Sequence, residues 1–209
     1  MPPVFDSTSF RRLWQSDSQD FRGHMLRLPA ESRHNRFGMG VSDDFVERYT
    51  ERNIGIENVI YGFFADGVLR AVGELRPMNP QRLLGIGGEM EAAFSVEPEW
   101  RKLGIGSQLM QLVIRAARTR CCTTLYLSFL SGNVPMRRLA LKYGAEIETD
   151  CSESEAHIHP DLPTPMAIWD KTFDDARSFA IAALDFQRQR LQQSWQTDTG
   201  RYNNMRKSS

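Results

Sequence analysis

A short stretch in the middle of the chain holds the residues best suited to bind a phosphate group. Arg101-Lys102-Leu103-Gly104-Ile105-Gly106 follows a β-rich run and leads into an amphipathic helix. The first backbone N–H groups of a helix have no partner within it, and the helix dipole adds partial positive charge there. Glycines allow an anion to approach the backbone, and Arg101 and Lys102 supply charge beside it. The stretch therefore predicts an anion site that suits a diphosphate.

Two other phosphate-binding motifs fit this stretch less well. A P-loop requires Gly-Lys-Ser/Thr at the helix start, which the sequence lacks. A dinucleotide-binding fold would need a third glycine and an acidic residue after the following strand, and neither is evident at that spacing. A single G-x-G is also compatible with a plain turn, so the flanking residues have to decide.

Two glutamates precede the anion-binding stretch on the same predicted strand. Glu89 and Glu91 are two residues apart, so their side chains share one face of that strand. A carboxylate can remove a proton from a reacting group, although both side chains could equally be solvated on an exposed face. His157 and His159 could form a base or a metal pair, but no third ligand accompanies them. Exposed loop histidines are the simpler interpretation.

Composition restricts the class of protein. The 209 residues are 41% hydrophobic and 25% charged, which is typical of one globular domain with a tail. Lys plus Arg and Asp plus Glu number 26 each, so no general positive field attracts nucleic acid. No stretch approaches the roughly 20 apolar residues of a membrane helix, and no signal peptide is evident. With three cysteines and no metal-binding pattern, we expect a cytoplasmic protein without a metal, membrane or nucleic-acid partner.

The elements that would position these residues follow an α/β pattern. A short strand at residues 10–14 and two helices, the second capped by Ser42, are expected before the main sheet. Asp66-Gly67 between two β-rich runs predicts a hairpin of antiparallel strands. Residues 77–88 predict a loop because they contain two prolines and three glycines.

The second half of the chain continues with alternating strands and helices. A strand at residues 89–96 precedes a helix with an apolar stripe, and a strand at 123–130 precedes a helix at 133–143 that Gly144 ends. Two closing strands are expected at 145–151 and 164–169, around a loop at 157–160. The predicted organisation is a flexible N-terminus at 1–9, one domain at 10–171, a helix at 172–195 and a flexible tail at 196–209.

Two motifs resemble those of the GCN5-related N-acetyltransferase (GNAT) superfamily. Val96-Glu97-Pro98 followed by Arg101-x-x-Gly104-x-Gly106 resembles motif A of that family, and residues 133–145 resemble motif B. The resemblance covers residues 10–169. Residues 28–37 are also similar to the opening helix region of bacterial GNAT domains, including those of protein-lysine acetyltransferases.

The resemblance implies a fold, a co-substrate and a site. The fold would be a mixed, mostly antiparallel sheet that splays open at the cleft for acetyl-CoA, with helices on both faces. Glu91 matches the position of the base, ahead of Glu89, and the acceptor would be an amine; a homodimer stays open. The residues implied in cofactor binding come from the strand, the glycine turn and the next helix: Phe94, Ser95, Val96, Arg101, Lys102, Leu103, Gly104, Ile105, Gly106, Ser107, Asn133 and Met136.

The sequence departs from the family pattern at two positions. Lys102 stands where many relatives have glycine, and Ala140 stands where many have a tyrosine that acts as general acid. Tyr143 is three residues further along and so faces elsewhere on the helix. The first function to consider is an N-acetyltransferase acting on a primary amine. Its main rival is an acyl-CoA-binding or regulatory module of this fold that has lost turnover. A second rival is a structural or partner-binding protein whose motif match is accidental.

Overall fold

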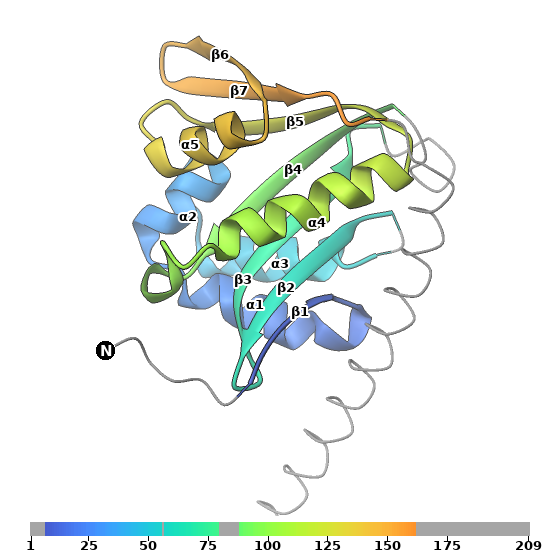
Figure 1. The fold of residues 1–209 in the computed structure, drawn as a ribbon. Helices are drawn as coiled ribbons and strands as arrows, with labels where there is room; N and C mark the ends of the chain where they lie inside the picture. Colours follow the sequence, from blue (N-terminus) through green and yellow to red (C-terminus); the bar gives the residue numbers. More distant parts are fainter. Residues whose placement is uncertain (1–6, 56, 80–87, 162–209) are drawn as a thin grey trace, which may run out of the picture.

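A seven-stranded sheet forms the centre of the molecule. The computed structural model describes residues 7–55, 57–79 and 88–161. The strand order is β1-β2-β3-β4-β5-β7-β6, and every neighbouring pair is antiparallel except β4 with β5 (Figure 1). The strands are β1 (Thr8–Arg12), β2 (Val59–Ala65), β3 (Val68–Pro77), β4 (Gly88–Val96), β5 (Cys122–Leu130), β6 (Glu146–Asp150) and β7 (Glu153–Ile158). The expected mixed, mostly antiparallel sheet is confirmed.

The sheet opens between its two parallel strands. β4 and β5 are paired only from Gly88 to Glu91 on the β4 side, and β5 then continues against β7. On its other edge, β4 stays paired with β3 up to Val96. Within the described part of the chain, residues 92–96 therefore present one strand edge without a neighbouring strand. This is the splay that the family resemblance predicts.

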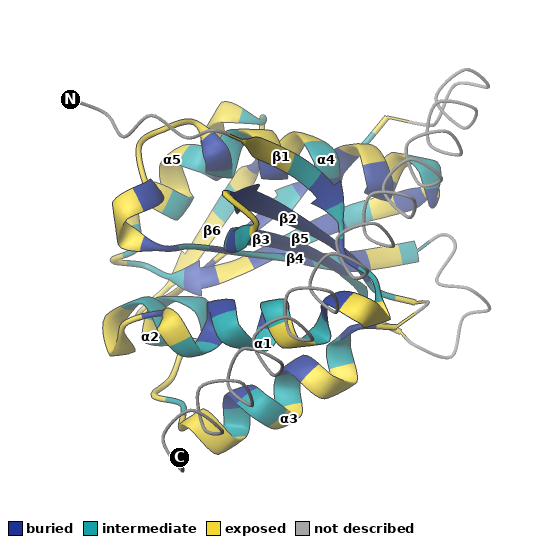
Figure 2. Ribbon diagram, turned by 90° about the horizontal axis from the view of Figure 1, so that it is seen from below, coloured by how far each residue is buried: buried dark blue, intermediate teal, exposed yellow. Residues whose placement is uncertain are grey.

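Helices cover both faces of the sheet, as expected. Figure 2 shows α4 (Ile105–Thr119) and α5 (Val134–Lys142) on one face, and α1 (Ser18–Arg27), α2 (Ala30–Phe37) and α3 (Asp43–Asn53) on the other. One apolar core lies between the sheet and α4, where Leu109 and Val113 are fully buried; a second core lies under α1 and α3 around Phe21. Two short 3-10 helices, η1 (Gln15–Asp17) and η3 (Pro98–Trp100), complete the described elements.

The expectation of two helices before the main sheet was wrong, because the structure has three. Leu28 has an extended backbone ahead of Pro29, and the residue before a proline disfavours helical geometry, so α1 ends at Arg27. α2 then begins as a separate helix at Ala30. None of its residues is classed as buried, and it therefore lacks the apolar periodicity by which a helix is recognised in a sequence.

Both hairpins have tight turns, but only the first was predicted correctly. Asp66 and Gly67 have positive φ angles of 49° and 76° between β2 and β3. The second hairpin joins β6 to β7 through Cys151, and not to a strand at residues 164–169, which lie outside the described residues. His157 and Ile158 therefore belong to a strand and not to the expected loop. The signal was the buried alternation of Ser154, Ala156 and Ile158.

Several expectations concern residues that the structure does not describe. The loop prediction for residues 80–87, the helix at 172–195 and the tail at 196–209 lie outside the described residues. The domain boundaries therefore stay predictions. None of the helices in the described ranges is long and apolar enough to cross a membrane.

Candidate functional site

A cavity lies where the sheet opens, and we call it the loop cavity. It has a volume of about 440 Å³ and lies between α2, the end of β4, the turn before α4 and the start of α5. Ten of the twelve residues predicted to bind the cofactor line it: Phe94, Ser95, Val96, Arg101, Lys102, Gly104, Gly106, Ser107, Asn133 and Met136. The other two do not: Leu103 is 53% exposed, and Ile105 is buried in the core.

The turn before α4 offers backbone N–H groups and open space to an anion. The first helical hydrogen bond of α4 runs from the N–H of Gln108 to the carbonyl of Gly104, at 3.1 Å. The N–H groups of the residues between these two come before the helical hydrogen bonds begin. Gly104 has a φ of 82°, and a Cβ added to it would meet no atom within 4 Å. A Cβ on Gly106 would approach only Leu139, at 3.8 Å. These features fit a bound diphosphate, for which the turn would supply donors without steric hindrance.

Arg101 connects this turn to the end of β4 and to α2, which also line the loop cavity. Its Nε donates to the carbonyl oxygen of Val96 at 3.1 Å, and its Nη2 donates to the Ser32 hydroxyl at 2.7 Å. The guanidinium thus bridges the end of β4 and α2 while it lines the cavity. That its charge binds an anion stays a prediction, and its position is fixed by hydrogen bonds that the sequence did not reveal.

The start of α5 forms the opposite wall. The Asn133 side chain caps α5 by accepting from the Met136 amide at 3.2 Å. Tyr143 donates its hydroxyl to the carbonyl of Ser107 at 2.8 Å, and this bond connects α5 to the first turn of α4. Ala140, at the position of the missing tyrosine, is fully buried. Because its hydroxyl donates to Ser107, Tyr143 joins α5 to α4.

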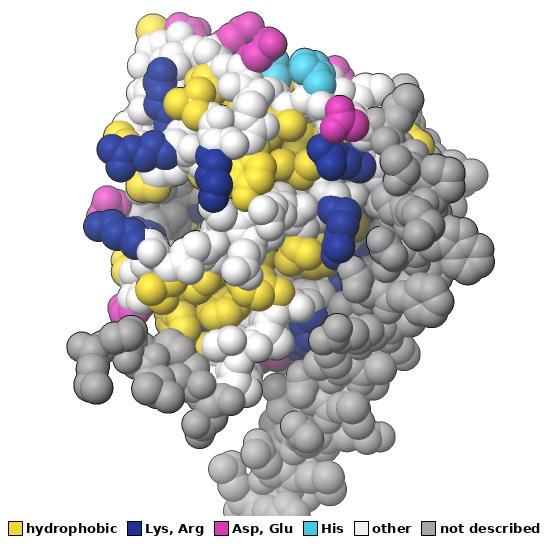
Figure 3. Space-filling view, viewed as in Figure 1, with side chains coloured by type: hydrophobic (Ala, Val, Ile, Leu, Met, Phe, Trp, Pro, Cys, Tyr) yellow, Lys and Arg dark blue, Asp and Glu magenta, His cyan; other side chains and the backbone are white. Residues whose placement is uncertain are grey.

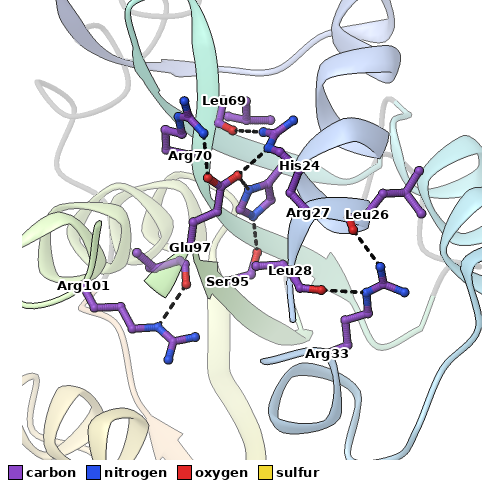
Figure 4. A network of polar contacts seen from close by, with 11 residues as sticks. His24, Leu26, Arg27, Leu28, Arg33, Leu69, Arg70, Ser95, Glu97 and Arg101 are labelled. Carbon is purple, nitrogen blue, oxygen red and sulfur yellow. Dashed lines mark hydrogen bonds and ion pairs between the residues drawn. The ribbon is translucent and has the colours of Figure 1, made fainter. Parts of the chain in front are cut away.

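A buried polar network fixes the end of β4 from the α1 face (Figure 4). His24 contacts the Ser95 hydroxyl at 2.8 Å through Nε2 and Glu97 at 3.3 Å through Nδ1. Arg27 and Arg70 each donate to Glu97 at 2.9 Å. Burial raises the pKa of Glu97, but hydrogen bonds from His24 and Arg70 outweigh it and lower the pKa to about 2. Burial lowers the pKa of His24, so a neutral imidazole bridges the serine and the carboxylate.

Another cavity has five carboxylates among its fifteen lining residues, and we call it the acidic cavity. Its volume is about 500 Å³. Glu148 and Glu155 lie directly opposite each other across β6 and β7, as do Asp150 and Glu153, and all four line the cavity. Like charges that face each other across strands repel. In the space-filling view, acidic side chains gather along the edge of the molecule formed by β6 and β7 (Figure 3). A cationic ligand would relieve this repulsion.

The two candidate bases lie in different surroundings. Glu91 lines the acidic cavity, and its Oε2 accepts from Arg76 at 3.0 Å. Its Oε1 has no hydrogen-bond donor among the described residues. Glu89 is exposed, accepts from the Tyr126 hydroxyl at 2.9 Å and lines neither cavity. Of the two, only Glu91 is in a position to meet a ligand in a cavity.

Neither of the two candidate histidines, His157 and His159, lines the loop cavity or the acidic cavity. His157 contacts Glu155 at 2.7 Å and packs edge-on against Tyr126, and His159 contacts the carbonyl of Thr123 at 3.2 Å. In the described ranges, no group of three or more His, Cys, Asp or Glu side chains could hold a metal ion.

Helix α2 contributes two site residues that the sequence reasoning missed, Ser32 and Asn35, and a third, Arg36, which from the sequence could either line an acceptor site or pair on the surface. Ser32, Asn35 and Arg36 line the loop cavity, and Arg36 also lines the acidic cavity. Their spacing of three and four residues puts them on one face of α2. This polar stripe was the available signal, but a polar stripe on a helix is usually a solvated face.

Comparisons with known proteins agree with this geometry. The family described as acetyltransferase (GNAT) matches residues 24–145. The GNAT domain of S. lividans PAT has a TM-score of 0.62 and 17% identity, over 73% of this chain and 90% of that one. A putative acetyltransferase from Salmonella typhimurium, solved with acetyl-CoA, has a TM-score of 0.56 and 14% identity over 76% and 97% of the two chains. The ribosomal-protein-S18-alanine N-acetyltransferase from Escherichia coli has a TM-score of 0.56 and 15% identity, with the same coverage. No curated protein matches the chain.

Proposed function

Since the chain belongs to the acetyltransferase (GNAT) family, we propose that it transfers an acetyl group from acetyl-CoA to a primary amine, either a small molecule or a lysine side chain. The observation that carries this proposal is the meeting of two chemically different cavities at Arg36. One offers backbone N–H groups at a glycine turn, which suits a diphosphate. The other is lined by carboxylates, which suit an ammonium group.

The loop cavity would hold CoA with residues at three places. The amides of the first turn of α4, with Arg101 and Lys102, would bind the diphosphate. The open edge of β4 at Phe94, Ser95 and Val96 would pair with the amide groups of the pantetheine arm, as an additional strand would. Asn133 and Met136 would contact the cofactor from the α5 side. The acetyl thioester that CoA supplies would then point toward the acidic cavity.

The acidic cavity supports a cationic acceptor. Five carboxylates line it, those of Glu91, Glu148, Asp150, Glu153 and Glu155, against the two guanidinium groups of Arg36 and Arg76. An amine with a pKa near 10.4 is almost entirely protonated at pH 7, so it would arrive as a cation. Attraction by these carboxylates would raise its local concentration.

The reaction requires the acceptor to lose a proton before it attacks. Glu91 would take that proton on its Oε1, directly or through water, while Arg76 holds its Oε2. The nitrogen lone pair then attacks the thioester carbonyl carbon, the nitrogen loses its second proton to solvent, and the C–S bond breaks with its electrons leaving on the CoA sulfur. A thiol pKa near 8.5 makes the thiolate a tolerable leaving group, so a proton from solvent can replace the acid that Ala140 does not supply.

The experiment measures acetyl transfer from acetyl-CoA to a panel of primary amines, alcohols and lysine-containing peptides. The readout is the release of the free CoA thiol. We expect transfer to amines only, with kcat/KM rising from pH 7 to pH 9 as the neutral amine becomes more abundant. The double variant Glu148→Gln/Asp150→Asn should raise the KM for the amine and leave that for acetyl-CoA unchanged. CoA binding without transfer to any acceptor would favour the rival function, a binding or regulatory module without turnover.

A further inference from the structure

Arg36 lies where the two cavities meet, and the proposed reaction gives it no role. It is the one residue in the described ranges that lines both cavities. Its side chain is only 6% exposed, although α2 as a whole has no residue classed as buried. A donor of an acetyl group in the loop cavity and an amine in the acidic cavity would have to meet beside this guanidinium.

A buried carboxylate and a tyrosine hold Arg36 in place. Its Nη2 donates to Glu74 Oε1 at 2.6 Å and to the Tyr49 hydroxyl at 2.7 Å, and Tyr49 donates in turn to Glu74 Oε2 at 2.6 Å. Glu74 is 1% exposed. Burial lowers the pKa of Arg36, but attraction by Glu74 outweighs burial and raises it, so the guanidinium stays charged. Two residues, Tyr49 of α3 and Glu74 of β3, thus fix one side of the guanidinium.

The other side of the guanidinium has unused donors. Arginine carries five N–H groups, and only those of Nη2 are engaged here. Nε is buried without a hydrogen-bond partner, and Nη1 has none among the described residues. The Nε atoms of Arg22, Arg70 and Arg76 are also buried without a hydrogen-bond partner, so an unpaired Nε alone does not indicate a ligand. At Arg36 the unused donors belong to a side chain that lines both cavities, and there they are available to a ligand.

We propose that Arg36 is a catalytic residue that donates a hydrogen bond to the carbonyl oxygen of the acetyl thioester. This inference rests on the proposed acetyl transfer. As the amine forms its C–N bond, the carbonyl π electrons move onto that oxygen, and the fixed positive charge of Arg36 stabilises them. The electrons return when the C–S bond breaks and the sulfur leaves with its pair. A donor that Glu74 and Tyr49 hold in place beforehand stabilises this charge without reorganisation.

The alternative is that Arg36 only neutralises Glu74 and anchors α2 to β3. The double variant Arg36→Met/Glu74→Gln separates the two roles, because it removes both charges and leaves neither one buried alone. If Arg36 is catalytic, this variant keeps its melting temperature and its stabilisation by CoA, while kcat falls about 10²–10³-fold. The KM values for amine and acetyl-CoA should stay within about threefold, because the hydrogen bond to the carbonyl oxygen is much stronger in the transition state, where that oxygen carries negative charge, than in the bound thioester.

Two further variants complete the test. Arg36→Ala leaves room for a guanidinium ion beside Glu74, and added guanidinium should restore part of its lost kcat, which a purely structural role would not predict. Arg33→Met is the matched control: Arg33 lies on the same helix, donates to the backbone of Leu28 and Leu26, and lines neither cavity, so its kcat should be unchanged.

The outcomes distinguish this inference from the function on which it rests. A double variant with normal CoA stabilisation and a kcat within about tenfold of wild type overturns the role of Arg36 and leaves acetyl transfer standing. A raised KM for the amine at unchanged kcat also overturns it, because Arg36 would then bind the acceptor. No transfer by the wild-type protein to any amine overturns the proposed function and the role of Arg36 with it.

Discussion

Replacing Gly104 tests the proposed diphosphate site most directly. Gly104 precedes α4 with a φ of 82°, and a Cβ at this position would point into open space. Gly104→Ala therefore adds only backbone strain, of about 1–2 kcal/mol for an L-residue in the left-handed region. Gly104→Glu adds the same strain and also places a carboxylate where the diphosphate would bind. The alanine variant is thus the matched control for the glutamate variant.

The size of the effect follows from ligand linkage. A ligand at a hundredfold excess over its Kd stabilises the native state by about 2.7 kcal/mol. For a chain of 209 residues, this corresponds to a rise in melting temperature of about 5–11 °C. Two unit charges about 4 Å apart repel by about 4 kcal/mol at an effective dielectric constant of 20, which weakens CoA binding by more than a hundredfold. The remaining stabilisation is then at most about 0.4 kcal/mol, or about 1–2 °C.

The assay is thermal melting of the three proteins with and without CoA. We expect both variants to melt at a lower temperature than wild type in the absence of ligand. Gly104→Ala should keep most of the CoA response, and Gly104→Glu should lose it. If the glutamate variant melts cooperatively and shows the same rise with CoA as the alanine variant, the diphosphate does not bind at this turn.

Three further predictions follow from the site. Glu91→Gln should lower kcat by about 10²–10⁴-fold with CoA stabilisation intact, whereas Glu89→Gln should not; the reverse order would identify Glu89 as the base. Tyr143→Phe should cost about 1 kcal/mol of stability, measured by urea unfolding, and leave kcat near normal; a large fall in kcat would make Tyr143 the missing acid. Stability should fall on acidification. The pKa of His24 is lowered from 6.5 in the folded state, so below pH 6.5 the unfolded chain binds a proton at His24 more readily than the folded chain does. The stability that comes from the lowered pKa of Glu97 is lost between about pH 4.5 and 2. His24→Gln should therefore flatten the decline in unfolding free energy between pH 7 and 5, and an unchanged slope would contradict this assignment.

The parts of the fold that were predicted correctly depend on local chemistry. Asp66-Gly67 adopts the positive φ angles of a tight hairpin. Few residue pairs tolerate these angles, so the turn could be predicted from the types of these two residues. The apolar stripe of α4 is buried because one face of that helix covers the sheet. The glycine turn before α4 was recognisable for the same reason: its function depends on backbone conformation, and Gly104 is the residue that permits it.

The parts that were missed depend on contacts between distant segments. Arg36 and Glu74 are 38 residues apart, and nothing in either local sequence indicates that a pair of opposite charges lies buried under α2. The β6–β7 hairpin turns at Cys151, a residue not typical of such turns, and the acidic face appears only when both strands are paired in register. The acceptor side of the site is therefore less visible in the sequence than the cofactor side.

The open edge of β4 explains why so much of the site is built around this strand. From residue 92 onward, the described structure gives β4 a paired strand on the β3 side only, so hydrogen bonds to β5 cannot hold it in place. The two faces of the strand must do so instead. On one face, Phe94 and Val96 pack against the core formed with α4; on the other, Ser95 and Glu97 are held by His24 of α1. The open strand edge, where we propose that CoA binds, is thus positioned through its side chains, and mutations in α1 far from the reacting atoms should affect how CoA binds.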